Sequence, residues 1–70
     1  MTPSELRAAR TALGPRWGLN RPLHMAEMGR ALRLPGRDPG ASISNWERGR
    51  SPIKGPVAVA IEAMLAGYRP

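Results

Sequence analysis

The chain has 70 residues, no cysteine and a formal net charge of +6 at pH 7. A chain of this length forms one small domain, here residues 1–70, and the lack of cysteine excludes disulfides and thiolate metal sites. Because the pI is near 11.6, we expect an anionic partner, with nucleic acid ahead of a membrane surface or an acidic protein. A GC-rich genome, which also raises arginine content, is the alternative explanation of this charge.

The sequence contains no apolar run that approaches the length needed to span a bilayer. Its start, Met1–Glu5, lacks the basic-then-apolar layout of a secretory signal. These two absences predict a cytoplasmic protein without a membrane partner.

The first predicted helix spans residues 3–13. Thr2 is a suitable cap, Glu5 three residues later completes a capping box, and Gly14-Pro15 is typical of a helix end. The apolar stripe of this helix consists of Leu6, Ala9 and Leu13. Arg10 lies inside the stripe, and an arginine on a buried face needs an acceptor there.

A long joint, residues 15–23, separates this helix from a second one predicted over 24–33. Trp17 in the joint is interpreted as a core residue, with a partner surface as the alternative. Gly29 lies in the middle of the second helix, where it costs about 1 kcal/mol relative to alanine. We interpret Gly29 as the point at which another helix crosses closely; the alternative is a weak helix with an incidental glycine.

The third helix is predicted over 39–48, with Asp38 as its cap and its end at Gly49. One side of its helical wheel holds Ile43, Trp46 and Glu47. The opposite side is polar and uncharged up to its last residue, and consists of Ala41, Ser44, Asn45 and Arg48, with Gly40 and Ser42 at its margins. An ordinary solvated face more often carries Glu and Lys.

A basic, turn-rich loop, residues 50–55, precedes the fourth helix, which is predicted over 56–66 with Gly67 at its end. The apolar face of this helix consists of Val57, Ala60, Ile61, Met64 and Leu65. No segment has the pattern of a strand. The sequence therefore predicts an all-α fold, a compact bundle of four to five short helices.

Two helices joined by a turn, the second exposing small polar residues, follow the plan of a helix-turn-helix. One side of a recognition helix must enter the major groove, so its large residues belong on the buried side. Asn45 suits adenine, Ser44 suits several bases and Ala41 suits a thymine methyl group. Arg37 precedes the helix and is expected to reach a phosphate or a base.

The stretch from Ala26 to Gly49 resembles the helix-turn-helix of Cro and the phage repressors. The resemblance rests on Ala26-Glu27-Met28-Gly29, Leu32, Leu34 and Ser42-Ile43-Ser44-Asn45-Trp46-Glu47-Arg48-Gly49. It extends to the first helix and to the entry of the last one, and so covers most of the chain. The joint 15–23 and the turn 34–38 are longer than is usual in that family, which leaves the angle of the recognition helix open.

Together, the residue pattern and the resemblance predict a set of DNA-contacting residues. Base readout is expected from Arg37, Gly40, Ala41, Ser42, Ser44 and Asn45. Phosphate contacts are expected from Arg21, His24, Arg48, Arg50 and Lys54. The resemblance also implies an ion pair between Arg10 and Glu47, which agrees with the acceptor that Arg10 needs. The alternatives are a solvated surface charge for each basic residue, a structural role for His24 and a solvent-directed side chain for Arg10.

We therefore expect a sequence-specific DNA-binding regulator, a homodimer that binds an inverted repeat and blocks RNA polymerase as an (auto)repressor. The last helix and the tail 67–70 are the expected dimer surface. The alternative is an antitoxin or adaptor that uses the same fold to bind a protein. An enzyme is not expected, because a single His, no Cys and no clustered metal ligands leave no catalytic set. No cofactor, metal or small-molecule ligand is expected either.

Overall fold

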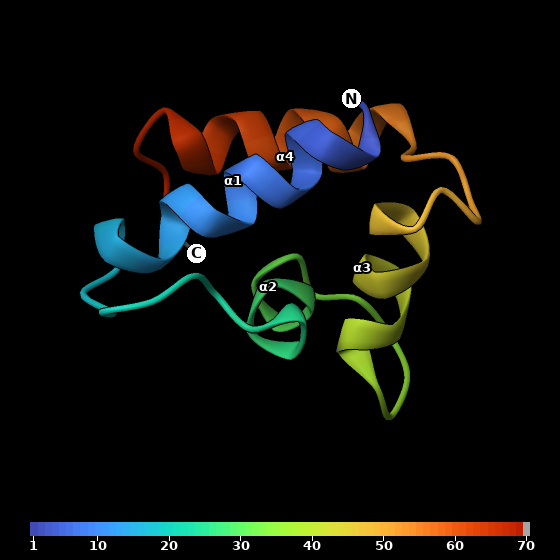
Figure 1. Ribbon diagram of the computed structural model, residues 1–70, viewed down its shortest axis with the longest axis horizontal. Helices are drawn as coiled ribbons and strands as arrows, with labels where there is room; N and C mark the ends of the chain where they lie inside the picture. The colour runs from blue at the N-terminus through green and yellow to red at the C-terminus, as the bar shows by residue number, and fades with distance from the viewer. Residues whose placement is uncertain (70) are drawn as a thin grey trace.

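The computed structural model describes residues 1–69, which form four α-helices and no strand. The helices are α1 (Pro3–Arg16), α2 (Met25–Ala31), α3 (Pro39–Glu47) and α4 (Gly55–Leu65). Helices α1 and α4 lie side by side in one layer, and α2 and α3 lie beneath them (Figure 1). The all-α class expected from the sequence is confirmed. None of the helices in the described part is long and apolar enough to cross a membrane.

Helix α1 does not end at Gly14-Pro15 as expected; it continues to Arg16. Gly14 is needed for close packing instead, because a Cβ atom there would lie 1.8 Å from the carbonyl oxygen of Arg21. The helix ends where Gly18 takes a left-handed conformation with φ of +86°. The amides of Gly18 and Leu19 then donate to the last turn, Leu19 to the Gly14 carbonyl at 2.9 Å, and so complete a glycine-based C-cap.

Helix α2 is shorter than the predicted 24–33, because the chain leaves the helix at Arg33. Arg33 has φ of +57° and is the only non-glycine residue among 1–69 with a positive φ. The amide of Leu34 donates to the carbonyl of Gly29 at 3.0 Å and closes the helix end. An L-residue in this conformation costs about 1–2 kcal/mol, so the packing on both sides of Arg33 must hold it there.

Helices α2 and α3 touch through two glycines. A Cβ atom on Gly29 would lie 2.0 Å from the carbonyl oxygen of Pro39, and one on Gly40 would lie 2.9 Å from the amide nitrogen of Ala26. The close crossing expected at Gly29 is therefore confirmed. Any larger side chain at Gly29 would push the start of α3 away from α2, so this contact sets the position of α3.

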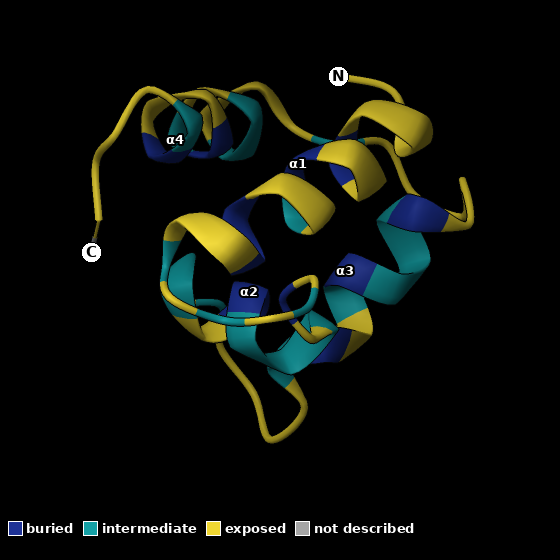
Figure 2. Cartoon of the chain, turned by 60° about the vertical axis from the view of Figure 1, so that its left-hand side comes forward, coloured by how far each residue is buried: buried dark blue, intermediate teal, exposed yellow. Residues whose placement is uncertain are grey.

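The core lies between the two layers (Figure 2). Its fully buried side chains are Leu6, Leu13, Leu23, Met28, Ile43 and Ile61. Each contributes about 2 kcal/mol by leaving water. Trp17 is half-buried and packs against this core, and the guanidinium of Arg69 lies 5.6 Å from the centre of its ring. This packing favours the interpretation of Trp17 as a core residue.

Candidate nucleic-acid interface

Helix α3 divides into the two faces that its sequence predicts. Ile43 and Glu47 are buried, and Trp46 is half-buried against the core. On the other face, Ala41 and Arg48 are exposed. Ser44 and Asn45, which lie between them, are half-buried. Because small side chains occupy the middle of this face, its surface is low enough for another molecule to approach the backbone of α3.

An open cleft of about 390 Å³ lies over this face, between α3 and the start of α2. Its lining consists of Met25, Ala26, Asp38, Gly40, Ala41, Ser44, Asn45, Arg48 and Arg50. The cleft thus brings together four of the six predicted base readers and two of the five predicted phosphate contacts. The remaining predicted residues are not part of its lining: Arg37, Ser42, Arg21, His24 and Lys54.

Gly40 lines the cleft but contributes no side chain to it. It is buried, and its Cα packs against the backbone of Ala26 at the floor of the cleft. It carries no side chain to the surface, and its role is to allow α3 to approach α2. Ser42 is half-buried and lies outside the cleft lining, whereas Arg37 is exposed in the connection that precedes α3.

A buried ion pair anchors α3 to α1. Arg10 Nε lies 2.7 Å from Glu47 Oε2, and Arg10 Nη2 donates to Glu47 Oε1 at 3.1 Å. The Glu47 side chain is 1% exposed. The third donor of the guanidinium, Nη1, reaches the carbonyl oxygen of Leu23 at 2.8 Å. The ion pair expected between Arg10 and Glu47 is therefore present, and Arg10 also joins the long joint to the helices.

Arg7 is a second partner of Glu47 and is not among the residues predicted from the sequence. Its Nε lies 3.4 Å from Glu47 Oε1, and its side chain is 64% exposed. The spacing in the sequence could have predicted this contact, because Arg7 precedes Arg10 by one helical turn and so lies on the same side of α1. With two arginines around one carboxylate, this corner keeps a net positive charge.

Arg21 is paired with a carboxylate. Its Nη1 and Nη2 donate to the two oxygens of Glu27 at 2.7 and 3.1 Å. Hydrogen bonding from Arg21, together with the His24 backbone amide at 2.7 Å, lowers the pKa of Glu27 from 4.5 to about 2. The phosphate contact expected from Arg21 would have to compete with this pair. His24 is exposed at the start of α2.

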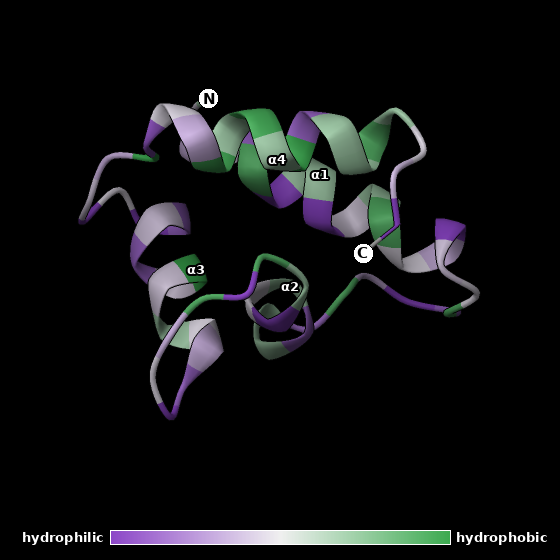
Figure 3. Cartoon of the chain, turned by 180° about the vertical axis from the view of Figure 1, so that it is seen from behind, coloured by the Kyte–Doolittle hydropathy of each residue, from purple (hydrophilic) through white to green (hydrophobic). Residues whose placement is uncertain are grey.

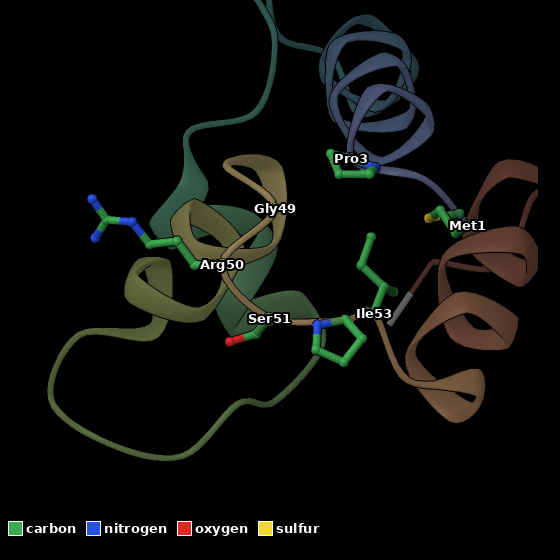
Figure 4. Close-up of a pocket in the computed structure, with 7 residues that line it drawn as sticks. Met1, Pro3, Gly49, Arg50, Ser51 and Ile53 are labelled. Atoms are coloured by element: carbon green, nitrogen blue, oxygen red, sulfur yellow. The ribbon is translucent and has the colours of Figure 1, made fainter.

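Arg48, Arg50 and Lys54 are exposed, and none of the ion pairs within residues 1–69 includes them. Arg50 also borders a second hollow, of about 420 Å³, between the start of α1 and the loop that follows α3. Its side chain extends away from Met1, Pro3 and Ile53, which lie on the other side of that hollow (Figure 4). Arg50 is therefore directed outward beside the α3 cleft rather than into the second hollow.

The structure adds Asp38, Met25 and Ala26 to the residues expected at this site. Asp38 had been assigned only as a helix cap, which it is: its Oδ1 accepts from the Gly40 amide at 3.2 Å. No group of three or more His, Cys, Asp or Glu side chains arranged to hold a metal ion occurs in residues 1–69. The arrangement offers hydrogen-bonding groups and positive charge around a cleft.

Comparisons of this chain with protein-family models, with curated proteins and with solved structures returned no match. The case for a function accordingly rests on the geometry of α3 and its surroundings.

Proposed function

We propose that this protein is a sequence-specific DNA-binding regulator in which α3 enters the major groove. The observation that carries the proposal is the exposed side of α3, where Ala41, Ser44 and Asn45 line a cleft with Arg48 and Arg50 at its far end. Small and uncharged side chains let a helix approach base edges closely, and the flanking guanidinium groups suit phosphates.

The charge distribution supports an anionic partner at this face. Glu27 is neutralised by Arg21, and Glu47 is neutralised by Arg10 and Arg7. Arg48 and Arg50 are exposed beside the cleft. In the complex we propose, Asn45 and Ser44 meet base edges, Ala41 meets a thymine methyl group, and Arg48 and Arg50 bind the backbone.

A fixed recognition helix is useful for this function, because base readout requires side chains to be held in register. The glycine contacts of α2 with α3 and the Arg10–Glu47 pair both restrain α3. In this proposal α2 and α3 are the two helices of a helix-turn-helix of the phage-repressor kind. The connection 32–38 is its lengthened turn.

We also propose that the protein acts as a homodimer through α4 and the tail. Figure 3 shows a predominantly hydrophobic α4. Its residue Val59 is 65% exposed, and Tyr68 just beyond the helix is 61% exposed. A dimer would place two copies of α3 on an inverted repeat, and such a dimer would repress by excluding RNA polymerase from an overlapping promoter.

Selection of bound sequences from a random DNA pool tests this function directly. The expected result is an inverted repeat whose half-sites lie about 10 base pairs apart. Affinity should also fall with salt, with a log–log slope of roughly 0.9 for each phosphate that is neutralised. If no motif is enriched, the proposal of a specific regulator is wrong.

Asn45→Ala supplies a test of the interface itself. It is expected to reduce the preference at one base pair of each half-site by about 1–3 kcal/mol. Asn20→Ala is the matched control, because Asn20 is exposed in the joint and does not line the cleft. Uniform weakening across all sequences by Asn45→Ala would instead assign Asn45 to the DNA backbone.

The exposed α4 face also favours a second candidate, an antitoxin or adaptor that binds a different protein through Val59 and Tyr68. The two candidates differ in their requirement for α3. In the regulator, Asn45→Ala impairs function and the chain self-associates in solution. In the adaptor, purified protein stays monomeric and shifts no DNA.

A further inference from the structure

From the geometry of the α3 cleft we infer that Asp38 is a specificity-determining residue that selects cytosine in each half-site. This inference rests on the proposed DNA-binding function and goes further, because it assigns a base to a residue outside the expected readout set. Asp38 supplies the only carboxylate among the described residues that line the cleft. The chain's other four acidic residues lie outside that lining.

Asp38 shares a side of α3 with the proposed base readers. Within the cleft lining, Ala41, Asn45 and Arg48 follow the three- and four-residue spacing that puts side chains on one helix face, and Asp38 precedes them as the N-cap of α3. This stripe begins with a carboxylate at Asp38, passes the neutral Ala41 and Asn45, and ends with the guanidinium of Arg48. The exposed face of α3 therefore changes from negative to positive along its length.

The position of the Asp38 carboxylate is restrained from two sides. Its Oδ1 accepts from the Gly40 amide at 3.2 Å, which orients the side chain. Gly40 itself packs against Ala26, and Pro39 packs against Gly29. These close contacts hold the first turn of α3 against α2. Asp38 is exposed and lines the cleft, and its described hydrogen bond uses Oδ1.

A carboxylate held at this place discriminates among base edges in the major groove. It accepts a hydrogen bond from the N4 amino group of cytosine, whereas guanine offers only the O6 and N7 acceptors and thymine offers O4. Adenine has an amino group, but its N7 acceptor lies beside that group and repels a carboxylate. Cytosine is therefore the base that Asp38 favours.

The helix geometry also limits where this cytosine lies. Asp38 and Asn45 are separated by about 10 Å along α3, at about 1.5 Å per residue. This distance corresponds to about three base-pair steps of about 3.4 Å. The selected cytosine should therefore lie within about three base pairs of the position that Asn45 reads. The carboxylate also repels phosphates in every sequence, and only sequences with this cytosine offset that repulsion through a hydrogen bond.

Asp38→Asn is the decisive variant, because Asn caps a helix as well as Asp does while an amide group replaces the negative charge and one acceptor oxygen. Sequences should be selected from a random pool with wild type, Asp38→Asn and Asp38→Ser. We expect the cytosine preference at one position per half-site to fall about tenfold in both variants. With Asn the position should change toward adenine, since Asn pairs with adenine. Binding to motif-free DNA should become tighter.

Glu5→Gln is the matched control, because it removes one carboxylate far along the chain from the cleft lining and keeps the capping box with Thr2. It should leave the selected motif unchanged. Thermal unfolding by circular dichroism checks that each variant folds. If Asp38→Asn selects the wild-type motif with cytosine retained, the inference is wrong while the proposed function stands. If wild type itself selects no motif, the proposed function fails and this inference fails with it.

Discussion

The two arginine–glutamate pairs with the shortest contacts have the same closest distance and very different surroundings. Nitrogen and oxygen approach to 2.7 Å both in Arg10–Glu47 and in Arg21–Glu27. The side chains of the first pair are 16% and 1% exposed, and those of the second are 39% and 26% exposed. The first pair joins helices that are far apart in sequence, whereas the second joins neighbouring segments. A contact distance alone therefore does not reveal how much a pair matters to the fold.

The two pairs differ in their contribution to stability because they differ in burial. Removing one partner of a buried pair leaves the other charge without water or counter-ion, and this costs about 3–5 kcal/mol. A charge near the surface regains its hydration when its partner is lost. Salt also screens exposed charges much more effectively than buried ones. The two pairs should thus respond differently to mutation, to pH and to ionic strength.

Arg10→Met has the largest expected effect. It leaves the buried Glu47 carboxylate with only the exposed Arg7, at 3.4 Å, and we expect the free energy of unfolding to fall by about 3–5 kcal/mol. The total free energy of unfolding of a chain of this size is about 3–10 kcal/mol, so the variant should lose a large part of its stability. Urea unfolding followed by far-UV circular dichroism measures this. Replacing both partners with methionine should restore part of the loss, and a wild-type midpoint for Arg10→Met would contradict the role of the pair.

The Arg21–Glu27 pair should contribute to the acid sensitivity of the protein. The pKa of Glu27 is about 2 in the folded chain against an ordinary 4.5, because of its hydrogen bonds from Arg21 and the His24 amide. A carboxyl group whose pKa is lowered by folding stabilises the fold at pH values above its pKa in the unfolded chain. That contribution is lost as the pH falls from 4.5 toward 2. Melting temperatures measured across this range should decline less steeply for Glu27→Gln than for wild type; parallel curves would be inconsistent with this assignment.

High salt should separate the two pairs further. In 1 M NaCl the Debye length is about 3 Å, so the Arg21–Glu27 attraction is largely screened. We expect the difference in melting temperature between Glu27→Gln and wild type to shrink at this salt concentration. The loss caused by Arg10→Met should persist. If salt reduces the loss of melting temperature equally for Glu27→Gln and Arg10→Met, burial does not distinguish the two pairs.

Arg7→Ala has the smallest expected effect, although Arg7 shares the carboxylate of Glu47 with Arg10. Its contact is 3.4 Å long and its side chain is 64% exposed. An ion pair of this kind contributes at most about 0.5 kcal/mol after allowance for solvent screening. Urea unfolding of Arg7→Ala beside Arg10→Met tests whether the two arginines are as unequal as their burial suggests. A loss near that of Arg10→Met would show that Glu47 depends on both.

The sequence predicted those features that local pattern determines. The four helices and the buried side of α3 follow from apolar periodicity, which also shows that Arg10, inside an apolar stripe, demands an acceptor. That Glu47 is this acceptor was implied by the resemblance to the phage repressors. The crossing at Gly29 was predicted because an unfavourable glycine in a helix needs a packing explanation. At Arg10 and at Gly29, a residue that conflicts with its surroundings indicated that a close contact lies there.

Features that depend on distant chain segments were not predicted. Gly14-Pro15 resembles a helix end, but Gly14 is required by the approach of the Arg21 carbonyl, which no local pattern reveals. The burial of Gly40 against Ala26 depends in the same way on how α2 and α3 pack. At the candidate site, the polar stripe of α3 was visible in the sequence. The place of Asp38 in the cleft was not, because its capping role already explained it.

The contacts of Arg10 have a consequence for local opening of the fold. Its one guanidinium group joins α1, the carbonyl of Leu23 in the joint and the carboxylate of Glu47 in α3. Neither α3 nor the joint can detach without exposing the same buried charge. Amide hydrogens of these segments should therefore exchange with solvent through one shared opening event, with similar protection free energies. Helix α1, the joint and α3 would then behave as a single cooperative unit, although none of these three segments is long enough to be stable alone.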